Sequence, residues 1–192
     1  MSSSDVDICN LALQRLGAKP ISSLSQDSTA ARACNRVYEH SRDSELRAHP
    51  WSFARARVSL AAESTDPIFG FAKQYPLPSD YLRILPNDGV NGTSTQNDFQ
   101  IEGRKILTDD SSPISVVYLR KVTDTAEFDA LFVELLAARI AMEIAEKVTQ
   151  SNTKKADAQQ QYKEVKAEAR KVNAFERPAQ ELPTDPWIAS RL

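Results

Sequence analysis

Glycine, cysteine and histidine are scarce in this sequence, and their scarcity argues against several classes of site. Five glycines in 192 residues make a glycine-rich loop around a phosphate group unexpected. The two cysteines do not form the Cys-x-x-Cys pattern of zinc and redox sites, and His40 and His49 do not have the spacing of zinc ligands. No Gly-x-Ser-x-Gly elbow marks a hydrolase nucleophile. The residues predict no metal, no cofactor and no catalytic centre, and we expect a protein that is not an enzyme.

An excess of positive charge and a long apolar run are also missing. The net charge is −2 and the pI about 5.8, which disfavours bulk electrostatic binding to nucleic acid, because such binding needs a basic surface. No stretch approaches the roughly 18 uninterrupted apolar residues of a membrane span. The first residues do not combine a basic segment with an apolar one, as a signal peptide does. A hydrophobic content of 41% with 26% charged residues is typical of a globular domain, and we expect it to be made in a reducing cytosol.

The strongest helical pattern covers residues 124–150. Asp124 followed three positions later by Glu127 has the spacing of a capping box. Apolar residues then recur at intervals of three and four around most of the circumference, which is typical of a buried helix. At about 1.5 Å per residue this core helix would be roughly 35–40 Å long.

Three further helices are predicted around it. The first covers residues 4–16 with Ser4 as its cap, and the second runs from Asp27 or Ser28 to about Ala48. The last covers residues 153–175 and has one narrow apolar stripe, suited to lying antiparallel on the core helix. Cys9 and Cys34 fall on the inward faces of the first two helices and are expected to be buried thiols. A disulfide between them would require these two helices to pair closely.

The middle of the chain predicts strands rather than helices. Prolines cluster between residues 67 and 113, and proline interrupts a helix. Strands are expected at 81–85, in a hairpin at 99–107 that turns at Gly103, and at 114–122. The predicted fold class is therefore α+β. It comprises a mainly helical four-helix bundle (1–50 and 123–176), a β-rich insertion with one small antiparallel sheet (51–122) and an extended C-terminal arm (177–192).

Two groups of residues are candidates for contacts with other molecules. Trp187, Ile188 and Leu192 stand on the proline-broken arm, which cannot bury them by itself, so we expect them to form a protein interface. Arg47, Arg55 and Arg57 could contact DNA phosphates or form surface salt bridges, and the acidic composition favours salt bridges. Trp51 and Phe53 are expected to lie in the core.

Five segments, taken in order, resemble the tail tubular protein A family of short-tailed phages. They are residues 7–17 (DICNLALQRLG), 21–32, 49–54 (HPWSFA), 99–109 and 128–134. Together the matching segments extend over about residues 5–175, and residues 177–192 match least clearly. The specificity lies in the ordered set, because no single segment is distinctive alone.

That resemblance implies a structural head-to-tail adaptor of a virion, made in the host cytoplasm. Members of this family form a ring, usually of twelve copies, that joins the portal protein to the tail nozzle protein. Double-stranded DNA passes through the lumen of the ring without sequence-specific binding, and no membrane is involved. Two alternatives stay open. One is a nucleic-acid-binding or packaging accessory protein that uses the three arginines, and the other is a glycan hydrolase with Glu102 or Asp109 as the acid.

Overall fold

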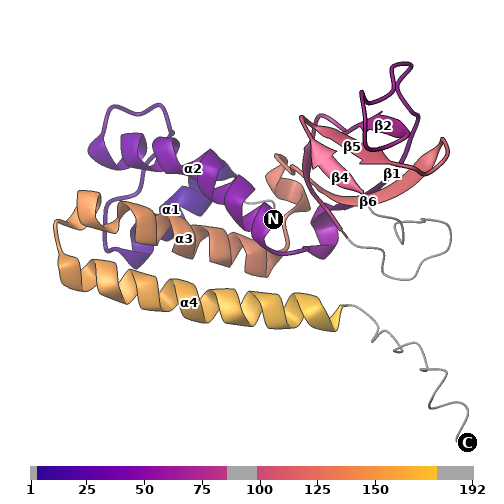
Figure 1. Cartoon of the computed structure of the whole chain (residues 1–192). Helices are drawn as coiled ribbons and strands as arrows, with labels where there is room; N and C mark the ends of the chain where they lie inside the picture. The colour runs from indigo at the N-terminus through magenta and orange to yellow at the C-terminus, as the bar shows by residue number, and fades with distance from the viewer. Residues whose placement is uncertain (1–3, 86–98, 177–192) are drawn as a thin grey trace, which may run out of the picture.

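The protein divides into a helical half and a β half, which lie side by side (Figure 1). The computed structural model describes residues 4–85 and 99–176. The helical half contains α1 (Asp5–Arg15), α2 (Thr29–Ala48), α3 (Ala130–Thr149) and α4 (Asn152–Phe175). The β half contains six strands, and two short 3₁₀ turns, η1 (Ser52–Ala54) and η2 (Thr125–Glu127), connect it to the helices.

The ends of α1 and α2 agree with the predictions from sequence. The Ser4 hydroxyl accepts a hydrogen bond from the Asp7 backbone N–H, and the Asp7 side chain accepts one in return from the Ser4 backbone, which completes a capping box. Ser28 caps α2 in the same way through the N–H of Ala31. Gly17 follows α1 with a φ of +68°, a conformation that glycine adopts without strain.

The core helix begins later than predicted. Asp124 accepts a hydrogen bond from the Ala126 N–H and thereby caps only the short turn η2. Phe128 then adopts an extended conformation, and Asp129 caps α3 through the N–H of Leu131. The sequence therefore contains two aspartate caps in succession, and the second one starts the helix.

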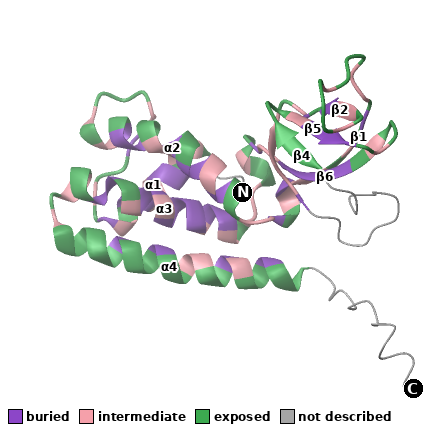
Figure 2. Cartoon of the chain, viewed as in Figure 1, coloured by how far each residue is buried: buried purple, intermediate pink, exposed green. Residues whose placement is uncertain are grey.

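The predicted four-helix bundle with a single inserted sheet is corrected by the structure. The fold is α+β, with four helices and two three-stranded antiparallel sheets. The four helices do not contribute equally to a shared interior. Instead α3 is central and contacts α1, α2 and α4, while α4 packs chiefly against α3. Figure 2 shows this difference as a largely buried α3 beside a largely exposed α4.

The two sheets have the strand orders β1-β6-β3 and β2-β5-β4. The first consists of β1 (Arg55–Leu60), β6 (Ile114–Arg120) and β3 (Tyr81–Ile84), and the second of β2 (Lys73–Pro76), β5 (Lys105–Thr108) and β4 (Gln100–Glu102). Strand β2 was not predicted, and it ends at a proline. Proline is tolerated here since β2 lies at the edge of its sheet.

Strand β6 is buried on both faces and connects the two cores. Val117 and Leu119 pack into the large core formed with the helices, whereas Val116 packs into a second core between the sheets. Tyr75 and Ile106 face Val116 across this second core. The helices, the first sheet and the second sheet therefore form successive layers.

Aromatic side chains fill the junction between the two halves. The rings of Trp51 and Phe53 lie 5.2 and 5.1 Å from the ring of Phe132, and Phe128 lies 5.0 Å from the same ring. Trp51 is 1% exposed and Phe53 is partly buried against the same core. The prediction that both belong to the core is confirmed.

Candidate functional site

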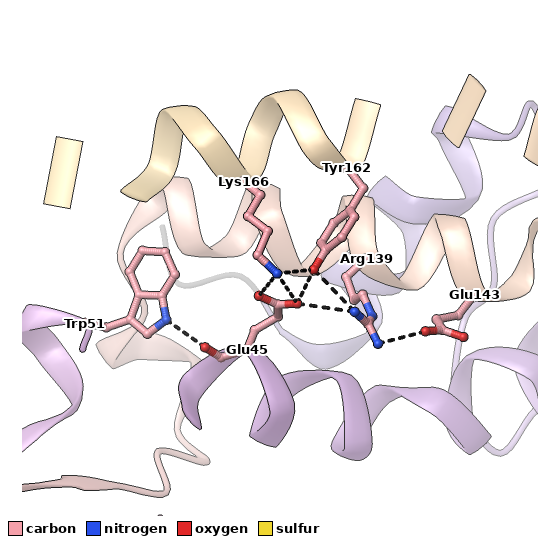
Figure 3. Close-up of polar contacts among 6 residues, drawn as sticks. All are labelled: Glu45, Trp51, Arg139, Glu143, Tyr162 and Lys166. Atoms are coloured by element: carbon pink, nitrogen blue, oxygen red, sulfur yellow. Dashed lines mark hydrogen bonds and ion pairs between the residues drawn. The ribbon is translucent and has the colours of Figure 1, made fainter. Parts of the chain in front are cut away.

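A buried carboxylate at the meeting point of three helices is the centre of the main polar cluster (Figure 3). Glu45 comes from α2, Arg139 and Glu143 from α3, and Tyr162 and Lys166 from α4. Glu45 is 1% exposed, and a charge so deeply buried is costly unless it is paired.

The polar partners of the Glu45 carboxylate come from α3 and α4, whereas Glu45 itself belongs to α2. The Tyr162 hydroxyl donates to Glu45 Oε1 at 2.5 Å, and Lys166 Nζ donates to the Tyr162 hydroxyl at 2.5 Å. Lys166 Nζ also lies 3.4 Å from Glu45 Oε2, and Arg139 Nη1 lies 3.5 Å from Oε1. Arg139 further pairs with Glu143 at 2.9 Å. The carboxylate thus ties α2 to both α3 and α4.

The guanidinium of Arg139 stays charged within this cluster. Burial acts to lower the pKa of Arg139. The hydrogen bond with Tyr162 and the carboxylates of Glu143 and Glu45 outweigh burial, so the pKa is raised. Because Glu45 has almost no contact with solvent, a solute cannot reach its carboxylate. The cluster connects α4 to α2 and α3.

A second polar contact holds the end of α4. Asn173 is 8% exposed, and its Oδ1 accepts hydrogen bonds of 3.0 Å from both the N–H and the hydroxyl of Ser52. Its Nδ2 lies 2.9 Å from His49 Nε2. These contacts connect α4 to the segment that leaves α2 for the β half.

The most exposed apolar side chains of the described chain lie in the loop between β1 and β2. Ile68 is 98% exposed and Phe69 is 86% exposed, and we call these two residues the apolar tip. The loop projects from the β half, away from the helices (Figure 1). Two large apolar residues side by side in water are unusual for a segment that only connects strands.

Hydrogen bonds and an ion pair fix the base of this loop. Gln74 Nε2 donates to the Thr65 carbonyl at 2.7 Å, and Lys73 Nζ pairs with Asp66 at 2.9 Å. The Ala72 N–H donates to Asp109 Oδ1 at 2.8 Å. The apolar tip is therefore presented by an anchored base, and Asp109, the candidate acid of the hydrolase hypothesis, takes part in the anchoring.

The three predicted arginines have different surroundings. Arg47, at the end of α2, donates a hydrogen bond to the carbonyl of Leu82 in β3. Arg55 is partly buried on β1 and also has interactions within the chain. Arg57, on the same strand, is exposed. Arg47 therefore links the two halves of the protein, and a role of the three in contacting DNA stays a prediction.

Trp187, Ile188 and Leu192, the predicted interface residues of the arm, lie outside the described residues. Sequence reasoning missed both the apolar tip and the Glu45 cluster. The tip had a signal, because Ile68 and Phe69 stand between Pro67 and Gly70, directly after the polar residues 63–66. The cluster had none, since its members come from three helices that are distant in sequence.

Within residues 4–85 and 99–176, no group of three or more His, Cys, Asp or Glu side chains is placed to hold a metal ion. No helix in the same ranges is both long enough and apolar enough to cross a membrane. Neither a protein-family model nor a curated protein matches the sequence.

Proposed function

We propose that this protein is a structural head-to-tail adaptor of a phage virion, which forms a ring between the portal protein and the tail nozzle protein. The proposal rests on the resemblance of five ordered segments to tail tubular protein A, and the structural observation that carries it is the apolar tip. In this role the protein turns over no substrate, and its surfaces bind other proteins while DNA passes through the ring.

The apolar tip supports a protein-binding role through its energetics. Burying an isoleucine or phenylalanine side chain stabilises a complex by about 1.5–3 kcal/mol. Ile68 and Phe69 are adjacent and almost fully exposed, so both gains are available on docking. A few buried apolar anchors of this kind commonly carry most of the affinity of a protein interface. The anchored base of the loop reduces the entropy that docking would cost.

The Glu45 cluster supports a passive role for the helical half. Its carboxylate, phenol, ammonium and guanidinium groups include types that enzymes use, but in the folded chain they bond to one another. Their arrangement holds α2, α3 and α4 as one unit. Buried polar contacts of this kind would help a ring subunit to keep the relative positions of its helices.

The experiment that tests the proposal is assembly with a portal ring. The purified protein is mixed with the portal protein of a short-tailed phage, and native mass spectrometry and electron microscopy determine the mass and symmetry of the product. We expect several copies of this chain to add to one portal ring. Failure of any complex to form, at concentrations well above micromolar, would contradict the proposal.

A matched pair of variants connects assembly to the apolar tip. The double variant Ile68→Ser, Phe69→Ser removes both anchors, whereas Ser64→Ala changes an exposed residue of the same loop. We expect the double variant to fold normally, since neither side chain packs in the core, and to weaken binding to another copy or to the nozzle protein at least tenfold. Ser64→Ala should bind like the unchanged protein. Equal binding by all three proteins would mean that the apolar tip is not a binding site.

A further inference from the structure

The antiparallel pairing of α1 and α2 places two cysteines opposite each other. The Tyr38 hydroxyl of α2 donates a hydrogen bond of 2.6 Å to Asp5 Oδ1 of α1. Cys9 lies one helical turn after Asp5, and Cys34 lies one turn before Tyr38. The two helices run in opposite directions (Figure 1). One turn forward along α1 and one turn back along α2 therefore move in the same direction along the interface. Starting from the contact between Asp5 and Tyr38, this places Cys9 opposite Cys34.

The surroundings of the two thiols agree with this register. Both cysteines are free, and both are 0% exposed within the large core. The helices have Cα atoms within 8 Å of one another, so the backbones approach closely. The two thiols also influence each other's ionisation. Interaction with Cys34, together with burial, raises the pKa of the Cys9 thiol.

We propose that Cys9 and Cys34 form a buried dithiol that a low-molecular-weight disulfide converts to an intramolecular disulfide between α1 and α2. This inference rests on the pairing of α1 and α2 and does not depend on the proposed function. It assigns a covalent modification site to the buried interface between α1 and α2, which has no part in the proposed adaptor function.

The reaction is a double thiol–disulfide exchange. The thiolate of one cysteine attacks a sulfur of the small disulfide, forms a mixed disulfide and releases one small thiolate. The thiolate of the second cysteine then attacks the cysteine sulfur of that mixed disulfide and releases the second small thiolate. The two cysteine thiols lose two protons and two electrons, and the small disulfide gains both as two thiols.

Burial determines how fast this conversion takes place. With both sulfur atoms inaccessible to solvent, exchange requires a transient opening of α1 away from α2. In a reducing compartment the thiols therefore persist. In an oxidising medium the bridge forms slowly, and it then closes a loop of about 25 residues that restricts the unfolded chain.

Oxidised glutathione in excess, under native conditions and in a mildly alkaline buffer, is the probe for this reaction. We expect the intact mass to fall by two hydrogen atoms and the reactive thiols to disappear on titration in denaturant. Trypsin should then release the peptide ending at Arg15 joined to the peptide ending at Arg36, and a reductant should separate them. The oxidised protein should also melt at a higher temperature than the reduced one.

The variants Cys9→Ala and Cys34→Ala serve as controls, because neither can form the bridge and alanine suits a buried helical position. Each should acquire at most one glutathione and show no rise in melting temperature. Three outcomes would each overturn the inference: thiols that persist through prolonged oxidation of the folded protein, mixed disulfides with glutathione that never resolve, or bridges that form only between chains.

Discussion

Glu45 combines a charge with almost complete burial, so its removal should have a measurable consequence. Replacing it by glutamine keeps the volume of the side chain but leaves Lys166 without its nearest carboxylate. Arg139 would keep Glu143 as a partner, and Lys166 is 24% exposed and can reach water. We therefore expect Glu45→Gln to lower the free energy of unfolding by about 2 kcal/mol, below the usual cost of breaking a fully buried pair. Urea unfolding followed by circular dichroism measures this change.

The matched control is Lys155→Gln, which removes an ion pair at the surface. Lys155 pairs with Glu146 at 2.5 Å, but both side chains are at least half exposed. Water screens such a pair, so the expected change is below about 0.5 kcal/mol. Equal effects of the two substitutions would mean that Glu45 contributes no more to holding α2, α3 and α4 together than a surface ion pair does.

Tyr38 should make the protein sensitive to alkaline pH. Burial, reinforced by the hydrogen bond to Asp5, raises the pKa of Tyr38 in the folded protein above its ordinary value. The unfolded chain therefore loses this proton first as pH rises, and stability that is fully present below about pH 10 is lost above it. Tyr38→Phe should cost about 1 kcal/mol at neutral pH, through the lost hydrogen bond, and should make the alkaline loss less steep.

Urea midpoints measured from neutral pH to beyond about pH 10 test this prediction. Some alkaline loss should remain in the variant, because burial also raises the pKa of Tyr75 and Tyr118. Identical slopes for the variant and the unchanged protein would contradict the assignment to Tyr38.

Among the elements, α4 packs chiefly against α3 alone and buries few of its residues, so it should open more readily than α3. Four of its 24 residues are buried, against ten of 20 in α3, and burial of apolar contacts is what resists local opening. Asn173 supplies the polar connection at its C-terminal end. Asn173→Ala should therefore accelerate amide exchange in the last turns of α4 and leave α3 unchanged.

Hydrogen–deuterium exchange read by mass spectrometry resolves this difference peptide by peptide. Val172→Ala is the matched control, because Val172 is 40% exposed on the neighbouring position of the same helix. If exchange in α4 were slower than in α3, or if both variants behaved alike, Asn173 would have no special part in holding the helix.

Sequence patterns predicted elements well where a single local signal decides the structure. Ser4 and Ser28 fixed two helix starts, and Gly103, with a φ of +50°, formed the predicted hairpin turn. The start of α3 was misplaced because both Asp124 and Asp129 are good caps, and tertiary packing of Phe128 between them decides which one starts the helix. Strand β2 was missed because its pairing with β5 depends on residues about 30 positions away.

The candidate site was harder to predict than the elements. The partners of Glu45 lie on α3 and α4, and a hydrogen bond between side chains so distant in sequence leaves no periodic pattern. The division of the strands into two sheets was not predicted for the same reason, because it too depends on contacts between residues distant in sequence. The continuous apolar run along β6 is typical of a strand that is buried on both faces, but only the fold reveals that a second sheet covers one of them.

At the level of the whole molecule, the adaptor proposal requires at least two separate contacts. The apolar tip projects from the β half, and the C-terminal end of α4 lies well apart from it (Figure 1). Residues 177–192 continue the chain from that end, and Trp187, Ile188 and Leu192 among them are predicted interface residues. An adaptor joins two different proteins, so the tip and the arm are expected to bind different partners.

Removing each contact separately tests this arrangement. A chain that ends at Glu176 keeps every described helix and strand and should retain its melting temperature, but its binding to the portal should fall at least tenfold because three apolar residues are lost. The variant Ile68→Ser, Phe69→Ser should keep portal binding and lose another contact, either to the nozzle protein or to a neighbouring copy. Pull-down of each variant with portal and nozzle proteins separately measures both effects.

If truncation left portal binding unchanged, the arm would have no part in it. If either variant lost both partners together while remaining folded, the two contacts would belong to one surface, and a protein with one binding surface cannot bridge two others.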